Sequence, residues 1–264
     1  HYTWFQGAEL RGERTSVMQP QTAGNNVPLY APCRKLSIGD PFKWLTMGWQ
    51  DFRRAPWHSL AYGLVFVLLG WVLLYFAWAN ENTALVVSLL FGFLIMGPIL
   101  CFGLYDASHQ LEKNNKPSFG HERKSAFHEM RHQRLFAMMM SMLLVFLIII
   151  LSILAAIDPL YGQKTGSYTI ASLLIAMFFA GLAFCTSVFT LPMILHRDAD
   201  GATAILTSIN AVSRNTRVFA LWAFLIFTLT AVGFVTALIG LAFITPVLGY
   251  ATWHAYRETI ITEG

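Results

Sequence analysis

The sequence predicts an all-α polytopic membrane protein with six transmembrane helices, arranged as three hairpins that each follow an interfacial amphipathic helix. Three observations support this fold class. Of the 264 residues, 56% are hydrophobic and only 12% are charged, which is far from the balance of a soluble domain. The hydrophobic residues gather in stretches long enough to cross a bilayer. Nearly all Lys and Arg residues fall in alternate polar segments, and such a bias sets orientation in a membrane.

Residues 1–35 are rich in Gly, Gln, Pro, Asn and Thr. This composition predicts a loosely ordered cytoplasmic tail, followed by a six-span membrane domain over residues 36–264. The apolar stretches of that domain cover residues 60–78, 84–105, 135–157, 168–195 and 218–253. As a single helix the last stretch would be roughly 50 Å long, against a hydrocarbon core of about 30 Å. We therefore expect it to fold back near residues 233–240 and to form two spans.

The distribution of cations predicts the topology. Seventeen of the eighteen Lys and Arg residues lie before the first span, in the loops near residues 106–134 and 196–217, or at the C-terminus, and only Lys164 lies in an alternate loop. With six spans, those segments share one face of the membrane, which the positive-inside rule makes cytoplasmic. Both termini are then cytoplasmic. Anionic headgroups of that leaflet are the expected partners of the basic residues, and no nucleic-acid partner is expected.

A weak internal repeat supports three units. The second, fourth and sixth spans each carry a proline near the cytoplasmic end, at Pro98, Pro192 and Pro246. An amphipathic helix precedes each hairpin, as is typical of helices in the headgroup layer. The predicted apolar stripes are Phe42, Leu45, Trp49 and Phe52, then Phe119, Phe127 and Met130, then Ala202, Ile205, Ile209 and Val212. The predicted lipid-interface residues are Trp44, Trp49, Arg53, Arg54 and Trp253.

Polar residues follow each of the three prolines. They are Asp106, His109, His196, Asp198, His254 and Arg257. Because they occupy equivalent places in the repeat, they could ring a cytoplasmic vestibule, as in a channel or carrier. The alternative is that they cap helices and anchor them at the interface, which is the commoner role. No ionisable residue lies well inside a predicted span, although proton pumps and ion-coupled transporters usually need one.

His121, His128 and His132 form the sharpest cluster of potential metal ligands. A helical projection places them on one face, and His128 and His132 could share a metal ion as adjacent ligands. A solvated face of an interfacial helix is the simpler interpretation, because His121 is two turns away. We therefore expect no metal, with His128 and His132 as weak candidates, and no cofactor. The sequence contains no Gly-rich phosphate loop, nucleophile elbow or HExxH motif, so we predict no catalytic residues and no enzyme.

Two separated motifs resemble a known family. Residues 44–56, WLTMGWQDFRRAP, and residues 62–66, YGLVF, are similar to its entry motif, and residues 246–257, PVLGYATWHAYR, are similar to its C-terminal pattern. The family is domain of unknown function 2189, a set of predicted integral membrane proteins of bacteria, and the resemblance covers about residues 36–260. It implies an inner-membrane location and brings no established activity.

Some members of that family are labelled as cytochrome c oxidase subunits. This chain does not have the catalytic subunit's buried set of haem and copper histidines, so the resemblance allows at most an accessory role. Two function classes therefore remain. The first is a non-catalytic component of the inner membrane, an accessory or assembly partner of a larger complex, with a respiratory oxidase as one candidate. The second is a passive channel or carrier for a small or lipid-like solute.

Overall fold

In a computed structural model of the chain, the structure describes residues 31–79, 97, 101–118, 130–157, 165–197 and 199–261. The helices are α1 (Asp40–Arg54), α2 (Pro56–Ala79), α4 (Phe102–Glu112), α6 (Met130–Ile157), α7 (Thr165–Ser187), α8 (Thr190–Arg197), α9 (Gly201–Arg214), α10 (Thr216–Val235) and α11 (Leu241–Thr259). Extended pairing within the described residues is limited to one antiparallel bridge between Cys33 and Ile260. The all-α class is confirmed for this part of the chain.

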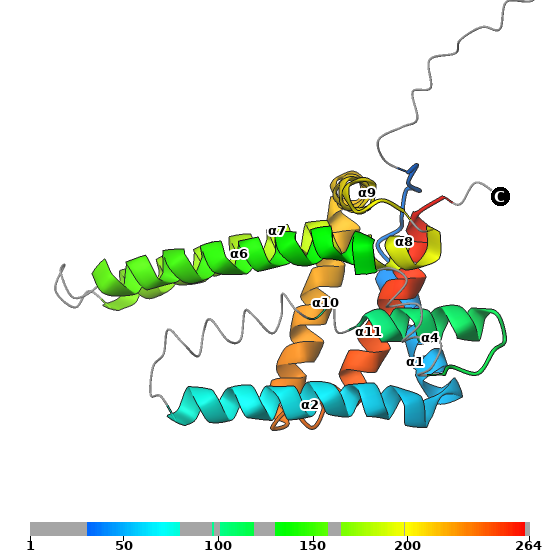
Figure 1. Cartoon of the computed structure of the whole chain (residues 1–264), viewed down its shortest axis with the longest axis horizontal. Coiled ribbons are helices and arrows are strands. Elements are labelled where there is room, and N and C mark those ends of the chain that lie inside the picture. Colours follow the sequence, from blue (N-terminus) through cyan, green and yellow to red (C-terminus); the bar gives the residue numbers. More distant parts are fainter. Residues whose placement is uncertain are drawn as a thin grey trace, which may run out of the picture.

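Figure 1 shows α6 and α7 side by side along one edge of the molecule and α2 along the opposite edge. Helices α10 and α11 lie between these edges and run across their direction. Within the described residues, three stretches are long and apolar enough to cross a membrane: Pro56–Phe76, Leu173–Arg197 and Thr216–Val235. The second predicted span lies mostly outside the described residues. The structure therefore shows several apolar helices, whereas the count of six spans and their pairing as hairpins stay predictions.

The predicted fourth span, residues 168–195, is divided into two helices. Helix α7 ends at Ser187 and α8 begins at Thr190. Pro192 explains the break, because it has no N–H to donate to the carbonyl of Val188 and its ring crowds that carbonyl. The break turns the polar end of α8 toward the other helices of the site described below.

The last apolar stretch folds back within the segment 233–240 that the sequence indicates. Helix α10 ends at Val235 and α11 begins at Leu241. Ala237 and Leu238 make the turn with φ values of 52° and 70°, a left-handed conformation that is uncommon for residues other than glycine. The turn brings α11 back along α10, and the two helices pack against each other.

Helix α11 is the centre of the packing and contacts α1, α2, α4 and α10. Two glycines allow its close approach to the N-terminal helices. A Cβ atom on Gly63 of α2 would overlap the backbone carbonyl of Ala242, and one on Gly48 of α1 would lie 2.5 Å from the carbonyl oxygen of Val247. Small residues at such crossings let helix backbones meet, as they do in membrane proteins generally.

The buried positions of α1 recur in α9 at a constant spacing of 160 residues. The buried set of α1 is Pro41, Trp44, Gly48, Asp51 and Phe52, and the buried set of α9 includes Gly201, Ala204, Ser208, Ala211 and Val212. In each case a single residue separates the helix from the apolar helix that follows, which is α2 after α1 and α10 after α9. The first and third amphipathic helices are therefore equivalent in both register and connection.

The predicted apolar stripe of α1 does not form a single buried face. Phe52 is buried, but Phe42 and Trp49 are exposed. The face that packs on α11 instead includes Trp44 and Gly48. The hydrophobic pattern missed this face because Gly48 contributes by having no side chain, which a count of apolar residues cannot register.

Residues 31–36 are held by hydrogen bonds to distant parts of the chain. The amide of Ala31 donates to Thr207 Oγ1 at 3.1 Å, and the amide of Leu36 donates to Asn215 Oδ1 at 2.9 Å. The side chain of Asn215 donates in return to the carbonyl of Arg34 at 3.0 Å. The end of the predicted tail, residues 31–35, is thus hydrogen bonded to distant helices. For the rest of residues 1–35, a loosely ordered tail stays a prediction. Residues 1–30 lie outside the described residues.

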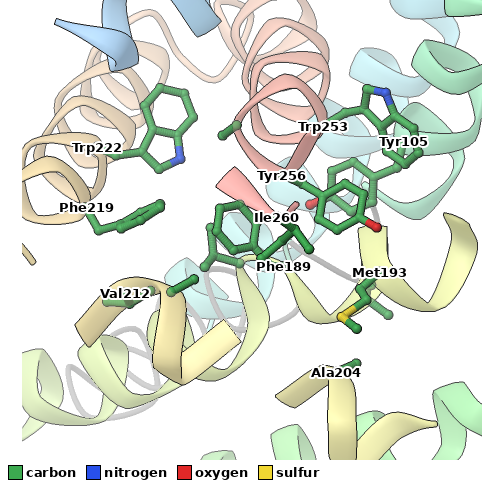
Figure 2. Packing of buried hydrophobic residues seen from close by; sticks show 14 of the residues in the cluster. Tyr105, Phe189, Met193, Ala204, Val212, Phe219, Trp222, Trp253, Tyr256 and Ile260 are labelled. Atoms are coloured by element: carbon green, nitrogen blue, oxygen red, sulfur yellow. The ribbon is translucent and has the colours of Figure 1, made fainter. Parts of the chain in front are cut away.

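Aromatic side chains join the N-terminal and C-terminal helices. Figure 2 shows Phe189 between Phe219 of α10 and Tyr256 of α11, with ring centroids 5.3 Å and 6.1 Å away. Trp44 of α1 stacks on Phe219 at 6.1 Å and meets the ring of Trp222 edge-on at 5.6 Å. This cluster fixes α1 against α10 and α11 and so positions the polar residues on their inner faces.

Candidate functional site

A buried carboxylate joins α1, α4 and α11. Asp51 of α1 is 3% exposed. Ser108 Oγ of α4 donates to Asp51 Oδ2 at 2.7 Å, and His254 Nε2 of α11 lies 2.8 Å from the same oxygen. The exposed guanidinium of Arg54 lies 3.5 Å from the other oxygen. Because the serine hydroxyl donates to the carboxylate and not to the imidazole, this set differs from a Ser-His-Asp triad.

A second polar cluster joins α4, α8 and α11 around His196. Arg257 Nη1 lies 3.1 Å from His196 Nε2, and Tyr256 Oη lies 3.0 Å from His196 Nδ1. A guanidinium can only donate, so Nε2 accepts and the neutral ring carries its proton on Nδ1, which donates to Tyr256. Arg257 Nε also pairs with Glu112 of α4 at 3.3 Å.

Aromatic rings enclose His196. The ring of His109 lies 5.4 Å from that of His196, and Trp253 lies 5.1 Å from His109 and 5.8 Å from His196. All three pairs are edge-to-face. The cluster therefore combines directional hydrogen bonds with packed rings, an arrangement that holds helices in one relative position.

The predicted vestibule residues are brought near one another, but in two clusters. His109, His196 and Arg257 belong to the second cluster, and His254 belongs to the first. Asp106 is buried on α4, where its Oδ2 accepts a hydrogen bond from Gln110 Nε2 at 2.9 Å. The remaining predicted residue, Asp198, lies outside the described residues. The described vestibule residues contact groups of the chain itself.

Four members of these clusters were not among the predicted site residues: Asp51, Ser108, Glu112 and Tyr256. A signal for Asp51 was present, because it follows Trp44 by seven residues and Gly48 by three, a spacing that places all three on one helix face. No comparable signal marks Ser108 or Glu112, whose partners lie on helices far away in the sequence.

Two of the predicted lipid-interface residues are buried, which corrects that prediction. Trp44 and Trp253 have no exposed surface. Trp44 Nε1 donates to Glu258 Oε2 of α11 at 2.7 Å, and Trp253 packs against the rings of the second cluster. A tryptophan beside a span resembles an interface anchor in sequence, but here a polar or aromatic partner from another helix covers it. Trp49, Arg53 and Arg54 are exposed, and their contact with lipid stays a prediction.

Glu258 links α1 to α11 through contacts that we expect to weaken in acid. It accepts from Trp44 Nε1 and pairs with Lys43 Nζ at 2.6 Å. Burial raises the pKa of Glu258, but the hydrogen bonds from Lys43 and Trp44 lower it more, and its pKa lies below the ordinary 4.5. Because the folded-state pKa is lowered, the contact stabilises fully above pH 4.5 and is lost as the pH falls through the folded-state pKa.

We expect Glu258→Gln to lower the free energy of unfolding by about 1–2 kcal/mol near pH 7 and by much less in acid. Thermal unfolding in detergent at a series of pH values measures this difference. Lys43→Gln is the matched control and should cost under about 1 kcal/mol, because Lys43 is mostly exposed. A gap between wild type and Glu258→Gln that stayed constant down to strongly acidic pH would contradict the role of the carboxylate.

The histidine cluster predicted as a weak metal site is not covered by the structure. His121 and His128 lie outside the described residues, and for His132 the backbone alone is described, in the first turn of α6. Within the described ranges, no group of three His, Cys, Asp or Glu side chains is placed to hold one metal ion. The absence of a metal at His121, His128 and His132 therefore stays a prediction, with His128 and His132 as the weak candidates.

Comparison with protein families gives one match. Residues 85–196 match the family model "Predicted integral membrane protein", domain of unknown function 2189. The resemblance predicted from the sequence is thus confirmed. The matched segment lies between the two motifs that suggested it, and it contains α4, α6 and α7 and the polar residues Asp106, His109 and His196. Asp51, His254 and Arg257, which complete the two clusters, lie outside it.

Searches of the curated proteins and of the solved structures gave no match. The family match and the apolar helices together show a predicted integral membrane protein.

Proposed function

We propose that this chain is a non-catalytic membrane component, an accessory or assembly subunit of a larger complex in the bacterial cytoplasmic membrane. Both termini would face the cytoplasm, and a respiratory oxidase is one candidate complex. The observation that carries the proposal is an open glycine, Gly181, among exposed apolar side chains of the α6–α7 pair.

The α6–α7 pair contacts the rest of the chain mainly through α8 and α9. Figure 1 shows both helices extending away from that end. Large apolar side chains along them are exposed: Met138, Met142, Phe146 and Ile149 on α6, and Leu174, Met177 and Phe178 on α7. Gly181 lies among them, and a Cβ atom built there meets no atom of the described residues within 4 Å. An open small residue on an apolar helix is where a second helix can approach closely.

The polar clusters favour a structural role over an aqueous path. The polar atoms of Asp51 on α1 receive partners from α4 and α11, and both ring nitrogens of His196 on α8 are hydrogen bonded to α11. These atoms are therefore used to connect the chain's own helices. Residues that line a conduction path must instead leave polar atoms available to the solute. The convergence of His109, His196 and Arg257 at one junction is the observation that keeps a passive channel or carrier as the second candidate.

Co-purification from native membranes in mild detergent tests the proposal. We expect a partner protein at fixed stoichiometry, and we expect Gly181→Leu to reduce its recovery at least several-fold, because the added side chain blocks close helix approach. Val235→Leu is the matched control, since Val235 is also exposed and apolar but lies on α10. Recovery of the chain without any partner would contradict the accessory role. Solute flux through that isolated chain, lost in His196→Ala and His254→Ala, would support the second candidate.

A further inference from the structure

Helix α1 has a second apolar face, directed away from the protein. Phe42 is 54% exposed and Trp49 is 45% exposed, and the ring of Trp49 stacks on Phe52 at 5.3 Å. Positions 42, 49 and 53 fall within about 40° of one another on a helical projection, nearly opposite Trp44. The outer face of α1, defined by Phe42, Trp49 and Arg53, is therefore aromatic with a cation at its C-terminal end.

The outer face lies at the entrance of a candidate span. Helix α1 ends at Arg54, Ala55 leaves helical geometry with φ −135° and ψ 60°, and the span Pro56–Phe76 begins at once. Trp57, in the first turn of that span, is 84% exposed. A helix joined by one residue to the end of a span lies at the depth of the lipid headgroups, where exposed Trp residues concentrate.

Helix α9 shows part of the same pattern, although Ser213 stands at the position equivalent to Arg53. Ile209 occupies the position of Trp49 and is exposed, while Val212 occupies the position of Phe52 and is buried. Helix α9 also ends one residue before a candidate span, Thr216–Val235. Arg214 and Arg217 lie on either side of that junction, whereas Arg53 and Arg54 both precede the first one. Both junctions thus have an exposed apolar residue and cations beside them.

We infer that the outer face of α1, together with Trp57 and Arg54, binds anionic phospholipid headgroups at the entrance of the α2 span. The aromatic rings enter the boundary between headgroups and acyl chains, and the guanidinium groups pair with lipid phosphates. The nearby carboxylates are already engaged, Asp51 by Ser108, His254 and Arg54, and Glu258 by Lys43 and Trp44. The charge of the exposed Arg53 therefore favours an anionic headgroup. This inference goes beyond the proposed accessory role and does not require a protein partner.

Tryptophan quenching by brominated phospholipids tests the position of the outer face. The full chain is reconstituted in phosphatidylcholine vesicles, and the fluorescence lost in Trp49→Phe isolates the signal of Trp49. We expect brominated acyl chains to quench that signal and aqueous iodide to leave it nearly unchanged. The signal lost in Trp57→Phe should show the same quenching pattern.

Trp222→Phe is the matched control, because Trp222 is fully buried and its signal should resist both quenchers. Quenching of Trp49 by iodide alone would overturn the inference, because the face would then lie in water. Quenching by neither agent would also overturn it, because protein, either this chain or a second copy, would then cover the face.

The lipid charge is tested by placing the bromines on one lipid of a mixture. Trp49 should be quenched more by brominated phosphatidylglycerol in phosphatidylcholine than by brominated phosphatidylcholine in phosphatidylglycerol. Arg53→Gln should lower this preference by about fivefold, the effect of one cation at a membrane surface. Lys116→Gln removes an exposed cation from the loop after α4 and should change it little. Equal quenching by both lipids in the wild type would overturn the anionic assignment.

Discussion

Gly63→Ala should destabilise the protein by about 3 kcal/mol, because the new methyl group would enter the backbone of α11. Its Cβ would overlap the carbonyl oxygen of Ala242 and lie 2.6 Å from the carbonyl carbon. Backbone atoms cannot rotate away as a side chain can, so α2 must move off α11 as a unit. Unfolding of the purified chain in detergent micelles, followed by near-ultraviolet circular dichroism, measures the loss.

Two other glycines provide graded controls for Gly63→Ala. At Gly70, a Cβ would meet the terminal methyl group of Leu238 at 2.8 Å, which can rotate, so Gly70→Ala should cost less. At Gly181 the space is open, so Gly181→Ala should be neutral or stabilise by up to about 1 kcal/mol through helix propensity. Ala242→Gly should not rescue Gly63→Ala, because the obstacle is backbone. Equal stability of the Gly63 and Gly181 variants would contradict the close crossing.

The parts of the fold that depend on local pattern were predictable from the sequence. Helices α2 and α10 follow from long apolar runs, since a run of that length has few other stable states in a membrane. The fold-back between α10 and α11 follows from length alone, because one straight helix of that size would exceed the bilayer.

The parts that depend on contacts between distant segments were not predictable. Trp44 has the local features of an interface residue, yet its N–H meets Glu258, which is 214 residues away in the chain. The face of α1 that packs on α11 is defined partly by Gly48, whose contribution is close approach and not burial of a side chain. The two polar clusters likewise need the positions of four helices, whereas a single sequence shows only that polar residues follow three prolines.

Asp51→Ala should lower the free energy of unfolding by about 3 kcal/mol, because it removes the shared acceptor of two buried or partly buried groups. The hydroxyl of Ser108 is buried and donates to this carboxylate, and His254 lies beside the same oxygen. Once the carboxylate is gone, both lose their partner in a site that water reaches poorly, and the cost of leaving a buried polar group unsatisfied adds to the lost bonds. Unfolding in detergent at neutral pH measures the change.

Two comparisons show whether the loss comes from the network around Asp51. Asp200→Ala removes an exposed carboxylate that caps α9 through the amide of Ala202, and it should cost about 1 kcal/mol. In a double-mutant cycle, Asp51→Ala and His254→Ala should together cost less than the sum of the single changes, by at least about 1 kcal/mol, because removing one partner already forfeits the shared bond. Strict additivity would mean that α1 is held to α11 by its aromatic residues and Gly48, and that the carboxylate contributes nothing to their alignment.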